Sequence, residues 1–121
     1  MEDLKKANKA ISKLIANPVK IMFPKIKGKL KIVTYSDAAF RNLPDQTSSG
    51  QGHIIFLTGD GNRSAPPAWA SNKVKRVVVS TLAAEAMSLQ ETIGHGIYLR
   101  AVLAETVGVK EEQIPIVSYI D

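Results

Sequence analysis

Hydrophobic and polar positions divide the chain into segments of different period. Residues 2–15 place apolar side chains at helical spacing with lysines on the opposite face, which predicts an amphipathic helix. Residues 18–29 contain two prolines and a glycine and predict an extended connector, because proline and the residue before it disfavour a helix. β-branched and aromatic residues from about Leu30 to Asp37 predict the first strand, and the polar residues 41–50 predict a loop.

Two further strands are predicted after this loop. Residues 53–59 are β-branched and apolar, and the Asp-Gly dipeptide that follows them is typical of a hairpin turn. Residues 65–71 predict the third strand. Its two prolines lack N–H groups, so this strand belongs at a sheet edge or begins only after Pro67.

The stretch 80–104 is the longest periodic segment and predicts a helix, which a last strand follows at the end of the chain. Gly94 and Gly96 weaken the helix, so a kink or a split into two helices is expected there. The apolar positions expected to face the sheet recur at steps of three and four: Leu82, Ala86, Leu89, Ile93, Ile97 and Leu103.

The order of these elements predicts an α/β fold with a mixed sheet. Three strands joined by short loops pair as antiparallel neighbours, whereas a helix between two strands implies a parallel return. The length of 121 residues fits one domain with a core of its own.

Charge is distributed unevenly along the chain. The net charge is +5, but residues 1–31 hold nine lysines against two acids, a net charge of +7, and the remainder is slightly acidic. A basic N-terminal arm favours a polyanionic partner, because lysines that contact phosphates release counterions. A solvated, lysine-rich surface helix is the alternative.

Composition excludes several classes of site. The chain has no cysteine, which excludes disulfides, thiolate nucleophiles and zinc–cysteine centres. The two histidines, His53 and His95, lie 42 positions apart and have no partner at metal-ligand spacing, and no serine has an evident histidine base. No apolar run approaches the roughly 20 residues of a membrane helix, and no apolar signal segment is present, so an intracellular protein without a membrane association is expected.

Three acids occupy positions where the pattern predicts apolar side chains. Asp37 ends the first strand, Asp121 ends the last, and Glu85 lies within the apolar stripe of the long helix. A capping box does not explain Glu85, because it needs Ser or Thr three residues earlier, whereas Ser80 and Thr81 lie five and four residues earlier.

Together these acids predict a metal site. Three carboxylates brought together repel one another unless a cation neutralises them, and Mg²⁺ prefers such oxygen ligands. Singly, each aspartate is also typical of a turn, and Glu85 of a helix edge. We therefore expect Asp37, Glu85 and Asp121 to converge at one end of the sheet.

A second cluster is basic. Lys73, Lys75 and Arg76 lie between the third strand and the long helix, where they are candidates for phosphate contacts or form a solvated surface. Trp69, just before them, is expected in the core rather than as a platform for base stacking.

Read as a whole, the chain resembles the ribonuclease H domain of Ty1/copia-type LTR retrotransposon polyproteins, in the region just after the reverse transcriptase. The resemblance covers essentially the whole chain. It rests on the order and spacing of these motifs: YSDAAF at 35–40, WASNK at 69–73, STLAAEAMSL at 80–89, YLR at 98–100 and IVSYID at 116–121.

The resemblance implies a ribonuclease H-like sheet of strand order 3-2-1-4, in which the fourth strand is parallel to the first. It also implies hydrolysis of the RNA strand of RNA/DNA hybrids with two Mg²⁺ ions, or with Mn²⁺, held by Asp37, Glu85 and Asp121. Lys73, Lys75 and Arg76 become contacts to the hybrid.

The resemblance further implies a basic helix and connector over 1–29 and a ribonuclease H-like domain over 30–121. In the family, a reverse transcriptase domain precedes this region in the same polyprotein, and a further strand, helices and a fourth carboxylate follow it. The domain is therefore expected to be incomplete at its C-terminus, with a last strand open to self-association. The alternative to a nuclease is a catalytically incomplete nucleic-acid-binding or connector fragment, and the expected location is a retrotransposon particle in the cytoplasm or nucleus.

Overall fold

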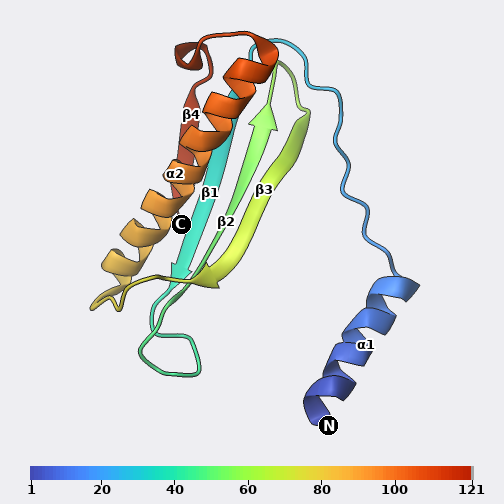
Figure 1. Ribbon diagram of the computed structural model, residues 1–121, viewed down its shortest axis with the longest axis vertical. Helices are drawn as coiled ribbons and strands as arrows, with labels where there is room; N and C mark the ends of the chain where they lie inside the picture. The colour runs from blue at the N-terminus through green and yellow to red at the C-terminus, as the bar shows by residue number, and fades with distance from the viewer. Residues whose placement is uncertain (121) are drawn as a thin grey trace.

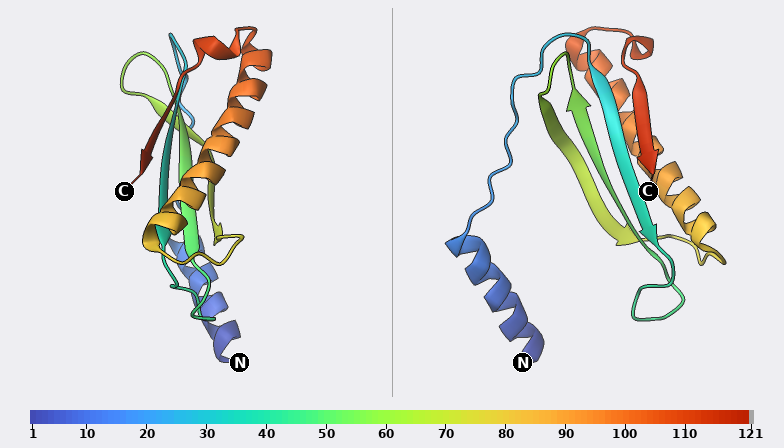
Figure 2. Two further views of the ribbon diagram at one scale, coloured as in Figure 1. Left: turned by 90° about the vertical axis from the view of Figure 1, so that its left-hand side faces the viewer. Right: turned by 180° about the vertical axis from the view of Figure 1, so that it is seen from behind.

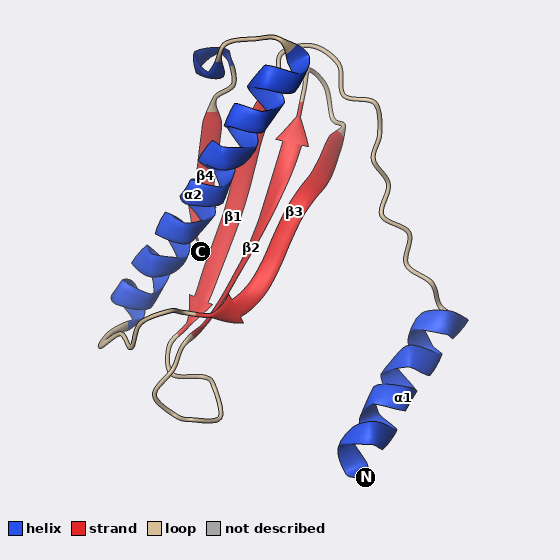
Figure 3. Ribbon diagram, in the orientation of Figure 1, coloured by secondary structure: helices blue, strands red, loops and turns tan. Residues whose placement is uncertain are grey.

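The computed structural model describes residues 1–120 of the chain. Figures 1 and 3 show a four-stranded sheet with one long helix against it and a second helix set apart. In chain order the elements are α1 (Glu2–Ala16), β1 (Lys31–Ala39), β2 (Gly50–Thr58), β3 (Ser64–Lys73), α2 (Thr81–Val107), a short 3-10 helix η1 (Glu111–Gln113) and β4 (Ile116–Ile120).

The sheet has the predicted mixed topology. Its strand order is β3-β2-β1-β4, with β1–β2 and β2–β3 antiparallel and β1–β4 parallel, which confirms the expected order 3-2-1-4. The proline-containing strand β3 lies at a sheet edge, the first of the two positions that its prolines allow. The β2–β3 register shifts between Ile55 and Leu57, close to these prolines.

Helix α2 covers one face of the sheet, and the side view in Figure 2 shows the two layers. The residues that α2 buries are mostly spaced four apart and are small: Ala84, Ser88, Thr92, Gly96 and Ala104. The predicted apolar stripe is therefore partly wrong, since Leu82 is 75% exposed and Ile97 is 45% exposed. Small side chains face the sheet because the helix lies so close to it. A Cβ atom built on Gly96 would stand 3.5 Å from Cγ2 of Thr34 in β1.

Two apolar clusters hold α2 at its two ends. Toward its C-terminus, the buried cluster contains Ile32, Ile55, Ala104 and Ile114. Toward its N-terminus, a second cluster joins Val74 and Val78 of the β3–α2 segment to Ala84 of the helix. Four partly buried apolar residues pack against this cluster: Ala38, Phe40, Ala83 and Met87. The second cluster fixes the start of α2 near the end of β1.

Helix α2 runs unbroken for 27 residues, so the expected split at the glycines is wrong. Its ends are well capped: the Ser80 hydroxyl accepts a hydrogen bond from the N–H of Ala83, and Gly108 takes the left-handed conformation (φ 79°) that commonly ends helices. Packing along the sheet and these caps outweigh the weak helix propensity of two glycines.

The face of the sheet opposite α2 has no helix on it within residues 1–120 (Figure 2). Strand alternation places Tyr35 and Trp69 on this open face, and Trp69 is 57% exposed, so its predicted core position is wrong.

Helix α1 contacts no other helix or strand of the described chain and stands away from the sheet (Figure 1). No described helix combines the length and the apolar character needed to cross a membrane.

The two helical glycines should respond oppositely to substitution. A Cβ on Gly94 meets nothing within 4 Å, so Gly94→Ala should raise the free energy of unfolding by about 1 kcal/mol through better helix propensity. Gly96 is buried against Thr34 and Ile116, so Gly96→Leu should lower it by about 1–3 kcal/mol through overpacking. Denaturant unfolding measures both, and equal effects at the two sites would contradict the close approach of α2 to the sheet.

Candidate active site and nucleic-acid surface

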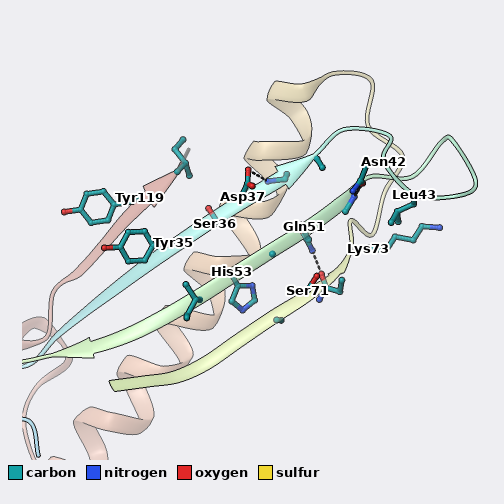
Figure 4. Close-up of a pocket in the computed structure, with 18 residues that line it drawn as sticks. Tyr35, Ser36, Asp37, Asn42, Leu43, Gln51, His53, Ser71, Lys73 and Tyr119 are labelled. Carbon is teal, nitrogen blue, oxygen red and sulfur yellow. Dashed lines mark hydrogen bonds between the residues drawn. The ribbon is translucent and has the colours of Figure 1, made fainter. Parts of the chain in front are cut away.

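Asp37 lies near the end of the central strand β1, on the open-face side of the sheet, and its side chain is exposed. Its neighbour Ser36 pairs with Ile120 of β4, so Asp37 is the first β1 residue beyond the described β1–β4 ladder. Its Oδ1 accepts a hydrogen bond of 2.8 Å from the N–H of Ala38, which orients the carboxylate (Figure 4). The carboxylate thus stands at an accessible end of the sheet.

The first turns of α2 are fixed to the same end of the sheet. The Ser88 hydroxyl donates a hydrogen bond of 3.1 Å to the main-chain carbonyl of Asp37. Glu85 lies one turn before Ser88 and is partly buried. Asp37 and Glu85 therefore belong to elements that one hydrogen bond and one apolar cluster hold together.

The third predicted ligand, Asp121, lies outside the described residues. Within residues 1–120, no three histidine or acidic side chains are grouped so as to hold a metal ion. The convergence of Asp37, Glu85 and Asp121 therefore stays a prediction. Chemically the set fits Mg²⁺, because all of its donors are carboxylate oxygens.

An open groove of about 1060 Å³ runs along the sheet beside Asp37. Tyr35 of β1 and Tyr119 of β4 pair in register, and their rings stack with centroids 5.3 Å apart (Figure 4). Toward the other side the lining becomes polar, with hydroxyl, amide and ammonium groups from Asn42, Ser71, Asn72 and Lys73. The groove thus combines aromatic rings, hydrogen-bonding groups and one exposed carboxylate.

The three predicted phosphate contacts differ in their surroundings. Lys73 pairs with Asp45 of the β1–β2 loop at 3.3 Å, so part of its charge is already offset. The Ser48 hydroxyl and the N–H groups of Ser48 and Thr47 hold the pKa of Asp45 well below its usual range. Lys75 and Arg76 are exposed in the segment before α2, at the mouth of a smaller cavity that Glu91 also lines.

A polar cluster between β2 and α2 escaped the sequence analysis. The rings of His53 and His95 stack with centroids 5.0 Å apart, and His95 Nε2 lies 3.7 Å from a carboxylate oxygen of Glu91. Gln51 donates hydrogen bonds to Glu91 and to Asn72. The available signal was positional: His53 has the same strand parity as the buried Ile55, and His95 lies four residues after Glu91 on one helix face.

Tyr35 and Tyr119 were also missed as a pair. Each lies in a predicted strand next to a predicted ligand, but their contact requires the parallel register of β1 and β4, which no local pattern specifies.

Comparisons of the chain with protein-family models, with curated proteins and with solved structures find no match.

The histidine cluster predicts a pH dependence of stability. Burial lowers the pKa of His53 from its ordinary 6.5, and the charge of the neighbouring His95 lowers it further, whereas the charge of Glu91 opposes the shift. The unfolded chain then binds more protons than the folded one as the pH falls through 6.5. We expect the free energy of unfolding to decline below this pH, and His53→Gln to reduce the decline.

Urea unfolding at a series of pH values, with each variant compared with the parent chain, measures this effect. A Lys110→Gln variant, which changes an exposed residue outside the cluster, serves as the control and should follow the parent. Identical slopes for the parent and the His53 variant would contradict the assignment.

Proposed function

We propose that the chain is a Mg²⁺-dependent endonuclease domain of the ribonuclease H type, which hydrolyses the RNA strand of RNA/DNA hybrids in the course of retrotransposon reverse transcription. The observation that carries the proposal is the position of Asp37. It is an exposed carboxylate at the end of the central strand of a 3-2-1-4 sheet, and the helix that bears Glu85 is hydrogen-bonded to its carbonyl. The family resemblance rests on the same residues in the same order.

In this proposal Asp37, Glu85 and Asp121 hold the metal ions. Bound ions of this kind activate a water molecule and stabilise the leaving oxygen in phosphodiester hydrolysis. The chain's own contribution is positioning. The Ala38 N–H orients the Asp37 carboxylate, and the Ser88 hydroxyl fixes the main chain beneath it. The Ser88 contact also fixes the helical turn from which Glu85 extends.

The groove supports a nucleic-acid substrate. RNA is distinguished from DNA by its 2′-hydroxyl, which both donates and accepts hydrogen bonds. Asn42, Ser71 and Asn72 offer amide and hydroxyl groups along the groove, on the side away from the tyrosines. Lys73, Lys75 and Arg76 lie at the end of β3 and just after it, where they would contact the phosphates of the hybrid.

A second candidate is a nucleic-acid-binding or connector module without catalysis, adjoining a reverse transcriptase domain of the same polyprotein. The lysine-rich N-terminal segment favours it, since residues 1–31 carry a net charge of +7 and α1 stands apart from the sheet. Such a segment binds phosphates with or without a complete metal site. Activity measurements distinguish the two candidates.

Cleavage of a labelled RNA/DNA hybrid tests the nuclease. The chain should cleave the RNA strand in Mg²⁺, and Asp37→Asn and Glu85→Gln should each lower the rate at least about 100-fold, because loss of a metal ligand removes several kcal/mol of transition-state stabilisation. Asp60→Asn is the matched control: Asp60 is an exposed acid in the β2–β3 turn, at the opposite end of the sheet, and its change should leave the rate unaltered. Binding without Mg²⁺-dependent cleavage would refute the nuclease and favour the second candidate.

Salt dependence tests the basic residues. If Lys73, Lys75 and Arg76 contact phosphates, hybrid affinity should fall steeply with salt concentration. Replacing all three with Ala should reduce the slope of log affinity against log salt by up to about 3, roughly one for each lost contact. Lys110, exposed near η1, provides the control substitution Lys110→Ala, which should leave the slope unchanged. An unchanged slope in the triple variant would show that the cluster is solvated surface.

A further inference from the structure

The open face of the sheet carries a band of aromatic side chains that no element covers in the described structure. On the side away from α2, each of the four strands contributes one aromatic side chain: Tyr35, Phe56, Trp69 and Tyr119. The Phe56 ring packs edge-on to the Tyr35 ring, and the Tyr119 ring stacks on the Tyr35 ring. Tyr35 is 46% exposed, Tyr119 53% and Trp69 57%. A sheet face of this kind normally packs against another layer of structure.

Helix α1 carries the second uncovered apolar surface of the chain. At 100° per residue, four large apolar side chains fall on one side of the helix, and its four lysines fall on the other. The apolar side chains are all exposed: Leu4, Ile11, Leu14 and Ile15. A 15-residue helix is marginally stable in water without a partner for its apolar face.

We propose that α1 packs through this apolar side onto the open face of the sheet in its own chain. The two surfaces match in chemistry, because both are apolar, and in size: α1 is about 22 Å long at 1.5 Å per residue, and the strands of nine residues are about 30 Å long. The packed arrangement gives the sheet a helix on each face and buries both of the surfaces that are now exposed.

The connector allows this contact. Residues 17–30 contain no helix or strand, and the main chain of Lys27 and Lys29 is hydrogen-bonded to Asp60 of the β2–β3 turn. The ten residues 17–26, at about 3.3 Å each, reach up to about 33 Å from that turn, which is enough for α1 to lie along the face. The tether also gives α1 an effective concentration on the order of millimolar at its own sheet, which favours the contact within one chain over contact with a second copy. The lysines of α1 then point to solvent.

This contact is argued from the apolar surfaces and the tether, without the proposed nuclease activity. In the packed position α1 covers Tyr35 and Tyr119, which also line the groove proposed for the nucleic acid, so helix and substrate are alternative occupants of that part of the face. The packing of α1 also accounts for the exposed apolar residues of the connector. Ile21, Met22 and Phe23 follow α1 and precede β1, so they would extend the same covered surface.

Trp69 is the sole tryptophan and lies on the open face, so its fluorescence reports the contact directly. In the intact chain its emission should lie at the short wavelengths of a buried indole. Ile11→Asp combined with Leu14→Asp should shift it to longer wavelength, whereas Lys6→Gln combined with Lys9→Gln, on the other side of α1, should not. Cooperative urea unfolding of each variant verifies that the sheet remains folded.

A cross-linking experiment provides an independent measurement. The chain has no native cysteine, so Leu14→Cys with Tyr119→Cys introduces a unique pair of thiols. A short thiol-specific cross-linker should join them within a monomer, and Lys9→Cys with Tyr119→Cys should react much less.

Three results would overturn the proposal. Emission that is the same in the intact chain and in the Ile11/Leu14 variant would mean that α1 does not cover Trp69. A short-wavelength emission that appears only with rising protein concentration would assign the face to a second copy. An emission that changes only when anionic lipid vesicles are added would assign α1 to a membrane surface.

Discussion

The close packing of α2 on strand β1 is the contact on which the rest of the structure depends. It relies on the small residues that α2 buries at positions 84, 88, 92, 96 and 104, and a Cβ at Gly96 would already be in van der Waals contact with Thr34 and Ile116, which leaves no room for a larger side chain. Two hydroxyls are buried there with their hydrogen bonds satisfied: Ser88 donates across the interface to the carbonyl of Asp37, and Thr92 donates within the helix to the carbonyl of Ser88. A larger side chain at position 88 would both lift the helix and break the hydrogen bond that joins Glu85's turn to Asp37.

Strand β4 depends on this packing in turn. It has one strand neighbour, β1, and it joins the sheet through the parallel ladder, the hydrogen bond from the Ile32 N–H to the carbonyl of Pro115, and the hydroxyl contact of 2.8 Å between Thr34 and Ser118. Ile116 also lies against Gly96 of α2. Strand β4 therefore supports β1 within the sheet while α2 supports it from one face, and together they fix the strand that carries Asp37.

Much of the fold was predictable because its signals are local. β-branched runs, the hairpin dipeptide and the prolines of β3 specify strands, turns and an edge without reference to the rest of the chain. The buried side of α2 was not predictable from hydrophobicity, because proximity to the sheet selects Ser88, Thr92 and Gly96 over larger apolar residues. A tryptophan in a strand is usually covered, which predicts a core position for Trp69, but a local pattern does not reveal which sheet face lacks a covering layer. The His53–His95 and Tyr35–Tyr119 pairs arise from contacts between elements distant in sequence, and the assembly of the three acids includes a residue outside the described chain.

Side chains along β1 point alternately to the two faces of the sheet, so the number of residues in this strand is more tightly constrained than their identities. Ile32, Thr34 and Ser36 face α2, while Tyr35 and Asp37 face the groove. Deleting or inserting one residue between Lys31 and Ser36 would move each of these side chains to the opposite face of the sheet. The aspartate would then point into the interface with α2, and an apolar side chain would point toward the groove. Natural relatives of this chain should therefore vary in length in the β1–β2 loop and the β2–β3 turn, while the number of residues between the start of β1 and the aspartate stays constant even where their identities drift.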